Sequence, residues 1–140
     1  MKRMIRASNN RSSNRQIVRD VCDQLGWNYP TFVTKGKTGF ACKWGGLTAV
    51  EREVEKLSQK EKANLHDIVD QLTEEYGRND SVYQDPRYVE AYESYKNKRR
   101  QSYGQAKANV ASRLEEASKQ VGRKLELSPS GKIVILYDEV

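Results

Sequence analysis

The sequence predicts an α+β fold in which an antiparallel sheet of two hairpins packs against three to five helices. Short segments rich in β-branched and aromatic residues come in two pairs around glycine-containing turns. Between the pairs, apolar residues recur at helical spacing. The chain has 140 residues, the length of one domain. We expect a single domain over residues 13–140, preceded by a flexible basic arm over residues 1–12.

Both expected hairpins have turn residues at their centres. The first, over residues 31–44, surrounds a Lys-Gly-Lys turn. The second, over residues 124–138, surrounds a Ser-Pro-Ser-Gly turn, in which proline sets one backbone angle and glycine supplies another. Ile133 to Leu136 is apolar on both alternations, which predicts a strand covered on two faces or central in the sheet. No internal repeat is visible in the sequence.

Helices are expected before, between and after the first strands. Apolar residues at helical spacing predict a helix over residues 14–25, ended by Gly26. Thr48 with Glu51 has the pattern of a capping box, and Ser58 with Glu61 has it again. The segment that follows Thr48 is therefore one bent helix or two.

A long helix is expected over residues 86–121, because Asp85-Pro86 favours a helix start and the apolar period that follows is about 3.67 residues. Such a helix would be about 54 Å long, whereas a compact chain of this length has a radius of gyration near 14 Å. It must therefore break or protrude. Glycine is the weakest helix former in this stretch, so we predict a kink or break near Gly104.

Charge is unevenly distributed along the chain, whose net charge is +6. Residues 1–46 and 96–124 each carry a net charge of +7, whereas residues 47–95 carry −6 and residues 125–140 carry −2. This layout has two interpretations. The protein binds a polyanion, or its own segments neutralise one another.

Cations and aromatic residues are interleaved over residues 92–103. Lys and Arg neutralise phosphates and tyrosine rings stack on unpaired bases, so this segment is a candidate for nucleic-acid contact. Alternatively, Tyr88, Tyr92 and Tyr95 form a packing stripe, and we favour the core for these tyrosines. The hairpin lysines and the basic arm would extend the same surface. The candidate nucleic-acid-binding residues are Lys96, Lys98, Arg99, Arg100, Tyr103, Lys35, Lys37, Lys43, Arg3, Arg6 and Arg11.

The acidic block supports a different function. Its carboxylates would face the nucleic-acid-binding cleft of a host protein, as expected of an inhibitor or adaptor of the anti-CRISPR or anti-restriction kind. The candidate residues for this protein-binding alternative are Glu51, Glu53, Glu55, Asp67, Asp70, Glu74 and Glu75.

Residues that carry catalytic or metal chemistry are scarce. His66 is the only histidine, and Cys22 and Cys42 are 20 residues apart, outside any Cys-x-x-Cys pair. We therefore expect no catalytic residues, no metal site and no cofactor, and hence no enzyme.

Membrane insertion and export are not expected. Ile133 to Leu136 is far shorter than the roughly 20 apolar residues of a membrane-spanning helix. The basic start is not followed by the apolar stretch of a secretory signal, so we expect a cytoplasmic protein with two reduced thiols.

The first eight residues, Met-Lys-Arg-Met-Ile-Arg-Ala-Ser, resemble the start of small uncharacterised proteins encoded on phages and conjugative elements of gut bacteria. The resemblance implies a cytosolic accessory protein that acts on nucleic acid or on a host protein. It carries no catalytic residues across. Together with the charge layout, it favours a non-enzymatic protein that binds nucleic acid or a nucleoprotein through a basic surface.

Overall fold

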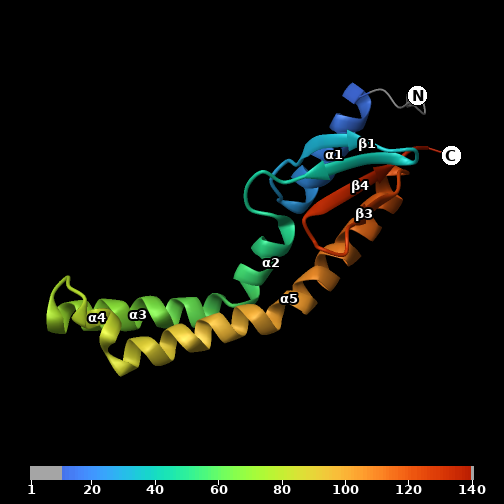
Figure 1. Cartoon of the computed structure of the whole chain (residues 1–140). Helices are drawn as coiled ribbons and strands as arrows, with labels where there is room; N and C mark the ends of the chain where they lie inside the picture. The colour runs from blue at the N-terminus through green and yellow to red at the C-terminus, as the bar shows by residue number, and fades with distance from the viewer. Residues whose placement is uncertain (1–10, 140) are drawn as a thin grey trace. The chain divides into compact units, whose positions relative to one another are not determined.

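The computed structural model describes residues 11–139 and contains, over that range, five helices and a four-stranded antiparallel sheet (Figure 1). The predicted α+β class is confirmed. The elements are α1 (Arg11–Leu25), β1 (Thr31–Lys35), β2 (Gly39–Lys43), α2 (Ala49–Leu57), α3 (Gln59–Tyr76), α4 (Ser81–Gln84), α5 (Pro86–Val121), β3 (Leu125–Leu127) and β4 (Ile133–Tyr137).

Contacts divide the chain into two compact units. The sheet unit comprises the described residues up to Arg52 and from Lys107 onward, and the helical unit comprises Glu53–Ala106. The expectation of one domain over residues 13–140 stays a prediction. So does the flexible arm, because residues 1–10 lie outside the described range. The described part of the chain begins with α1 at Arg11.

The two predicted hairpins form one sheet with the strand order β1-β2-β4-β3. The second strands of the two hairpins pair with each other, so β4 is central, as one interpretation of its sequence predicts. On one face of β4, Val134 and Leu136 are buried, whereas Ile133 and Ile135 on the other face are only half-buried. Coverage of both faces, the other interpretation, is therefore not found.

The sheet unit repeats one arrangement, a helix followed by a hairpin. Gly26 follows α1 and Gly122 follows α5, and each glycine has the positive φ that lets the chain turn out of a helix (75° and 69°). A hairpin follows each, and the middle pair of the β2–β4 register is Ala41 with Ile135. Both residues occupy the same place in their own strands. The two modules are therefore related by an approximate two-fold axis through this pair.

The core of the sheet unit lies between the sheet and the helices of these two modules. Its buried side chains include Val21 of α1, Leu114 of α5 and Leu136 of β4, each at most 1% exposed. Two tryptophans extend the core in an edge-to-face contact, with 6.2 Å between the ring centroids of Trp27 and Trp44. Both cysteines are buried as well.

Burial keeps the two thiols protonated. Desolvation raises the pKa of the thiols of Cys22 and Cys42 to about 12, so neither is a thiolate at neutral pH.

One of the two predicted capping boxes forms. The Thr48 amide donates to Glu51 Oε1 (3.0 Å), and the Glu51 amide donates to Thr48 Oγ1 (3.1 Å). The box predicted at Ser58 is wrong, because the buried Ser58 hydroxyl donates instead to the Val54 carbonyl (2.7 Å) and makes no capping bond. The chain therefore forms two helices, α2 and α3, that are separated at Ser58.

In the helical unit, α3 and the first part of α5 run antiparallel, with α4 at the turn between them (Figure 1). The buried apolar residues of these helices within the helical unit are Leu72 of α3, Val82 of α4, and Ala91 and Ala106 of α5. α5 continues through Gly104, so of the two predicted alternatives the break is wrong, and the kink stays a prediction. Nothing lies within 4 Å of a Cβ built at Gly104, so no packing forces the helix apart, and one glycine costs only about 1 kcal/mol.

Two glycine substitutions are expected to have opposite effects. Gly104→Ala adds a methyl group in open space within a helix, so it should raise the free energy of unfolding by about 0.5–1 kcal/mol in urea titrations.

Gly39→Ala places a Cβ against the Leu136 carbonyl oxygen and should lower the free energy of unfolding in the same titrations, because β2 and β4 must move apart. An unchanged stability of Gly39→Ala would contradict the β2–β4 register.

Candidate functional site

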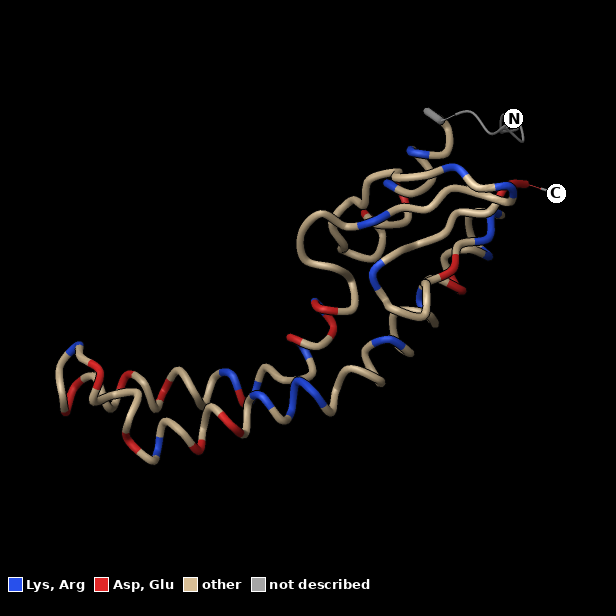
Figure 2. The backbone as a smooth tube through the Cα atoms, in the orientation of Figure 1, with Lys and Arg blue, Asp and Glu red and all other residues tan. Residues whose placement is uncertain are grey.

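The cationic part of α5 in the helical unit is only weakly neutralised. Figure 2 shows Lys and Arg gathered along the middle of α5. Lys96 pairs with Glu93 on the same helix at 3.7 Å, and both side chains are about half exposed, so solvent screens the pair. Among the described residues, Lys98, Arg99 and Arg100 form no ion pair with any carboxylate. The acidic helix α3 therefore does not neutralise these cations.

Neutral neighbours hold these cations in place. The Arg99 guanidinium lies over the Tyr95 ring, 5.6 Å from its centroid, and donates to the Tyr95 hydroxyl oxygen at 3.3 Å. Arg100 donates to Asn97 Oδ1 at 3.2 Å. Lys96 lies 5.2 Å from the centre of the Tyr92 ring. None of these partners carries charge, so the side chains are positioned while their positive charge is kept.

Most of the predicted cations share one side of α5. At about 100° per residue, Lys96, Arg99 and Arg100 fall within a sector about 100° wide. Lys98 lies about 160° away from Lys96 around the helix axis, so it is on a different side of α5, and its predicted contact with nucleic acid stays a prediction. Two tyrosines fall within the sector. We call the resulting set the basic face: Tyr92, Lys96, Arg99, Arg100 and Tyr103.

The tyrosines of the basic face are not core residues. Tyr92 is 39% exposed and Tyr103 is 37% exposed, so the favoured interpretation of a buried packing stripe is wrong for Tyr92. Tyr92 stacks on the half-buried Tyr88, with 5.7 Å between ring centroids and 10° between ring planes. Tyr83 of α4 meets Tyr88 edge to face at 5.1 Å. The rings of Tyr83, Tyr88 and Tyr92 thus form a row of aromatic contacts, and Lys96 lies next to the last ring.

An ion-pair cluster ties the start of α5 to the end of α3. Asp85 caps α5, since the Arg87 amide donates to Asp85 Oδ1 at 2.8 Å, as the Asp-Pro motif predicts. The Arg87 guanidinium donates to both oxygens of Asp85 and, in a bidentate pair, to both oxygens of Glu75, all at 3.0 Å. The Tyr76 hydroxyl donates to Asp85 Oδ2 at 2.9 Å. These bonds fix the two helices that carry the basic and acidic residues.

The remaining predicted cations belong to the sheet unit or to undescribed residues. Lys35 is paired with Asp138 at 2.8 Å, so its charge is neutralised. Lys37 and Lys43 are exposed in the first hairpin. The side chains of Arg3, Arg6 and Arg11 lie outside the described part of the structure.

The predicted acidic residues do not all form one surface. Glu51 belongs to the capping box, Glu75 pairs with Arg87, and Glu53 is 5% exposed. Glu55 is half-buried. The three that remain are exposed and lie on one side of α3 at helical spacing, and we call them the acidic stripe: Asp67, Asp70 and Glu74.

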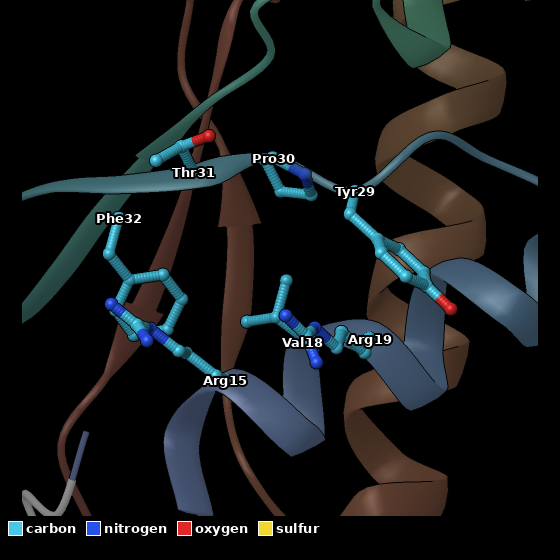
Figure 3. Close-up of a pocket in the computed structure, with 7 residues that line it drawn as sticks. All are labelled: Arg15, Val18, Arg19, Tyr29, Pro30, Thr31 and Phe32. Carbon is cyan, nitrogen blue, oxygen red and sulfur yellow. The ribbon is translucent and has the colours of Figure 1, made fainter. Parts of the chain in front are cut away.

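A second cationic and aromatic site, which the sequence does not predict, lies in the sheet unit. It is a pocket of about 200 Å³, lined in part by Arg15, Arg19, Tyr29 and Phe32 (Figure 3). The one available signal is the spacing of Arg15 and Arg19, four residues apart and thus on one side of α1. Nothing in the sequence places the two aromatic residues against that side.

Within residues 11–139, no group of three or more His, Cys, Asp or Glu side chains could hold a metal ion. Within the same range, every helix falls short of the combined length and hydropathy that a bilayer crossing requires.

Comparisons with family models, curated proteins and solved structures found no match to this chain.

The cluster at Asp85 predicts a loss of stability in acid. Bonds from Arg87 hold the pKa of Asp85 well below its usual value, so the cluster stabilises the fold above the unfolded pKa of about 4 and is lost as the pH falls below it. Asp85→Asn keeps a capping side chain but removes the charge. Between about pH 5 and pH 2, its thermal midpoint should fall less than that of the wild type. Equal acid sensitivity of the two proteins would contradict this role.

Proposed function

We propose that this chain is a non-enzymatic accessory protein of a phage or other mobile element, which binds nucleic acid or a nucleoprotein through the basic face of α5. The observation that carries the proposal is the lack of ion pairs from Arg99 and Arg100 to any described carboxylate, beside two exposed tyrosines. A cation that already pairs with a carboxylate contributes little to phosphate binding, whereas Arg99 and Arg100 form no such pair and can bind a phosphate.

The basic face supplies two kinds of contact. Its cations neutralise phosphates and release condensed counterions, which contributes affinity without sequence preference. The exposed rings of Tyr92 and Tyr103 add surfaces on which unpaired bases stack. Binding of this kind is expected to be broad in sequence and to weaken steeply with salt.

A charge-matched pair of variants tests the basic face. Lys96→Gln/Arg99→Gln/Arg100→Gln removes three cations from it, and Lys56→Gln/Lys60→Gln/Arg78→Gln removes three exposed cations from elsewhere in the helical unit. In anisotropy titrations with a labelled oligonucleotide, the first variant should lower the slope of log affinity against log salt by about 2 to 3, because each lost phosphate contact removes about 0.7–0.9.

The control variant should keep most of that slope, since its cations are not part of the basic face. Equal losses for the two variants would mean that only net charge matters. Absence of oligonucleotide binding by the wild type at low salt would refute the proposal.

A second candidate function, binding of a host protein, is favoured by the acidic stripe on α3. Its three carboxylates are exposed on one side, as a surface that mimics nucleic acid requires. Asp67→Asn/Asp70→Asn/Glu74→Gln should then abolish capture of a partner from a nuclease-treated bacterial lysate, while the basic-face variant retains capture. Capture that survives the loss of the stripe would contradict this candidate.

A further inference from the structure

The pocket of the sheet unit lies between α1 and β1, at the edge of the sheet (Figure 3). In this view, Arg15 and Phe32 lie at one end of the pocket, Arg19 and Tyr29 lie at the other, and Val18 points between them toward Pro30. Residues that line the pocket are Arg15, Val18, Arg19, Tyr29, Pro30, Thr31 and Phe32.

The pocket offers two cations to a ligand. Among the described residues, neither Arg15 nor Arg19 forms an ion pair with a carboxylate. The two carboxylates that follow on α1 are bonded to neutral groups instead, since Asp20 accepts from the Gln16 amide at 2.8 Å and Asp23 accepts from the Tyr29 hydroxyl at 2.5 Å. The guanidiniums therefore remain available for a phosphate, which they can bind in a bidentate manner.

The pocket also offers a fixed aromatic surface. Tyr29 is 49% exposed, yet its hydroxyl is held by Asp23, and the Arg19 guanidinium lies 5.6 Å from its ring centroid. The Phe32 ring is half-buried and packs against Phe40, with 5.0 Å between centroids. A ring that is already positioned loses little conformational entropy when a ligand stacks on it.

We propose that this pocket binds one unpaired base of a single-stranded nucleic acid, with the adjoining backbone phosphate at Arg15 and Arg19. The volume of about 200 Å³ accommodates a single base, since benzene occupies a cavity of about 150 Å³. The proposed function supplies the class of ligand, nucleic acid, and this inference rests on it. The inference adds that the nucleic acid is single-stranded.

An acidic peptide is the principal competing ligand, because a peptide strand could in principle pair with the edge of β1. The β1–β2 register shifts between Phe32 and Thr34, and this irregularity interrupts the regular row of backbone groups that an added strand would need. Val33 lies at the irregularity and is 58% exposed. The pocket therefore favours a ring with a phosphate over an added strand.

The first test separates stacking from the hydroxyl group of Tyr29. Tyr29→Leu removes the aromatic surface, whereas Tyr29→Phe keeps the ring and removes only its bond to Asp23. With fluorescein-labelled (dT)10 in anisotropy titrations, Tyr29→Leu should bind at least five-fold more weakly than Tyr29→Phe, as expected for the loss of one stacked base. Because Tyr29 is half exposed, both variants should fold, and circular dichroism melts are the check.

The second test concerns the two arginines and the strandedness of the ligand. Arg15→Gln/Arg19→Gln should weaken binding of (dT)10 more than binding of the (dT)10·(dA)10 duplex. The charge-matched control, Lys119→Gln/Lys132→Gln, changes exposed lysines elsewhere in the sheet unit and should affect both probes equally.

The outcomes distinguish this inference from the proposed function. The pocket is refuted if Tyr29→Leu and Tyr29→Phe bind (dT)10 equally, or if the arginine variant loses no more than its control, while the basic-face variant still reduces binding. A decaglutamate peptide that displaces (dT)10 from wild type but not from the arginine variant would assign the pocket to acidic peptides instead. Loss of binding in the pocket variants alone would support the pocket and refute the basic face.

Discussion

The pairing of β2 with β4 is the interaction on which the sheet unit depends. Each hairpin alone is a two-stranded ribbon, which is marginally stable in water, and only the central pairing makes a four-stranded sheet with one continuous buried face. The close approach of Gly39 to the Leu136 carbonyl belongs to this pairing. Within the first hairpin, β1 pairs with β2, and β1 forms one side of the pocket that Arg15 and Tyr29 line.

The helical unit carries its cations in a different physical setting. Few of its apolar residues are buried, and the bonds of Arg87 to Asp85 and Glu75 supply a specific tie between its helices. The carboxylates of Asp85 and Glu75 pair with Arg87 and form no ion pair with the cations of the basic face. The end of α3 and the start of α5 thus neutralise each other, as one interpretation of the charge layout predicts. Binding of a polyanion, the other interpretation, stays a proposal.

Local sequence patterns predicted most of the helices and strands. Features that depend on tertiary contacts, such as the Ser58 hydrogen bond and the pocket, could not be predicted from them. Hairpin turns, the Thr48 box and the Asp85 cap depend on residues close in sequence, and each forms where it was expected. Ser58 has the same local pattern as Thr48, but burial directs its hydroxyl to the preceding turn. The pocket could not be predicted, because its two sides meet only after the chain folds. The helix–hairpin repeat was invisible for a similar reason, since backbone pairing and not residue identity relates its halves.

In the sequence, the helical unit is inserted between the two helix–hairpin modules, and this insertion affects the order of folding. The residues that meet at the centre of the sheet, Ala41 and Ile135, are 94 positions apart. Closing a chain segment of that length costs entropy before any contact repays it, whereas each ribbon and each helix closes only a short segment. The helices and the two hairpins can therefore form first, and the β2–β4 pairing that joins the hairpins forms last. Until then, both inner strands present unsatisfied backbone groups, and this interval is when the nascent chain is most exposed to aggregation.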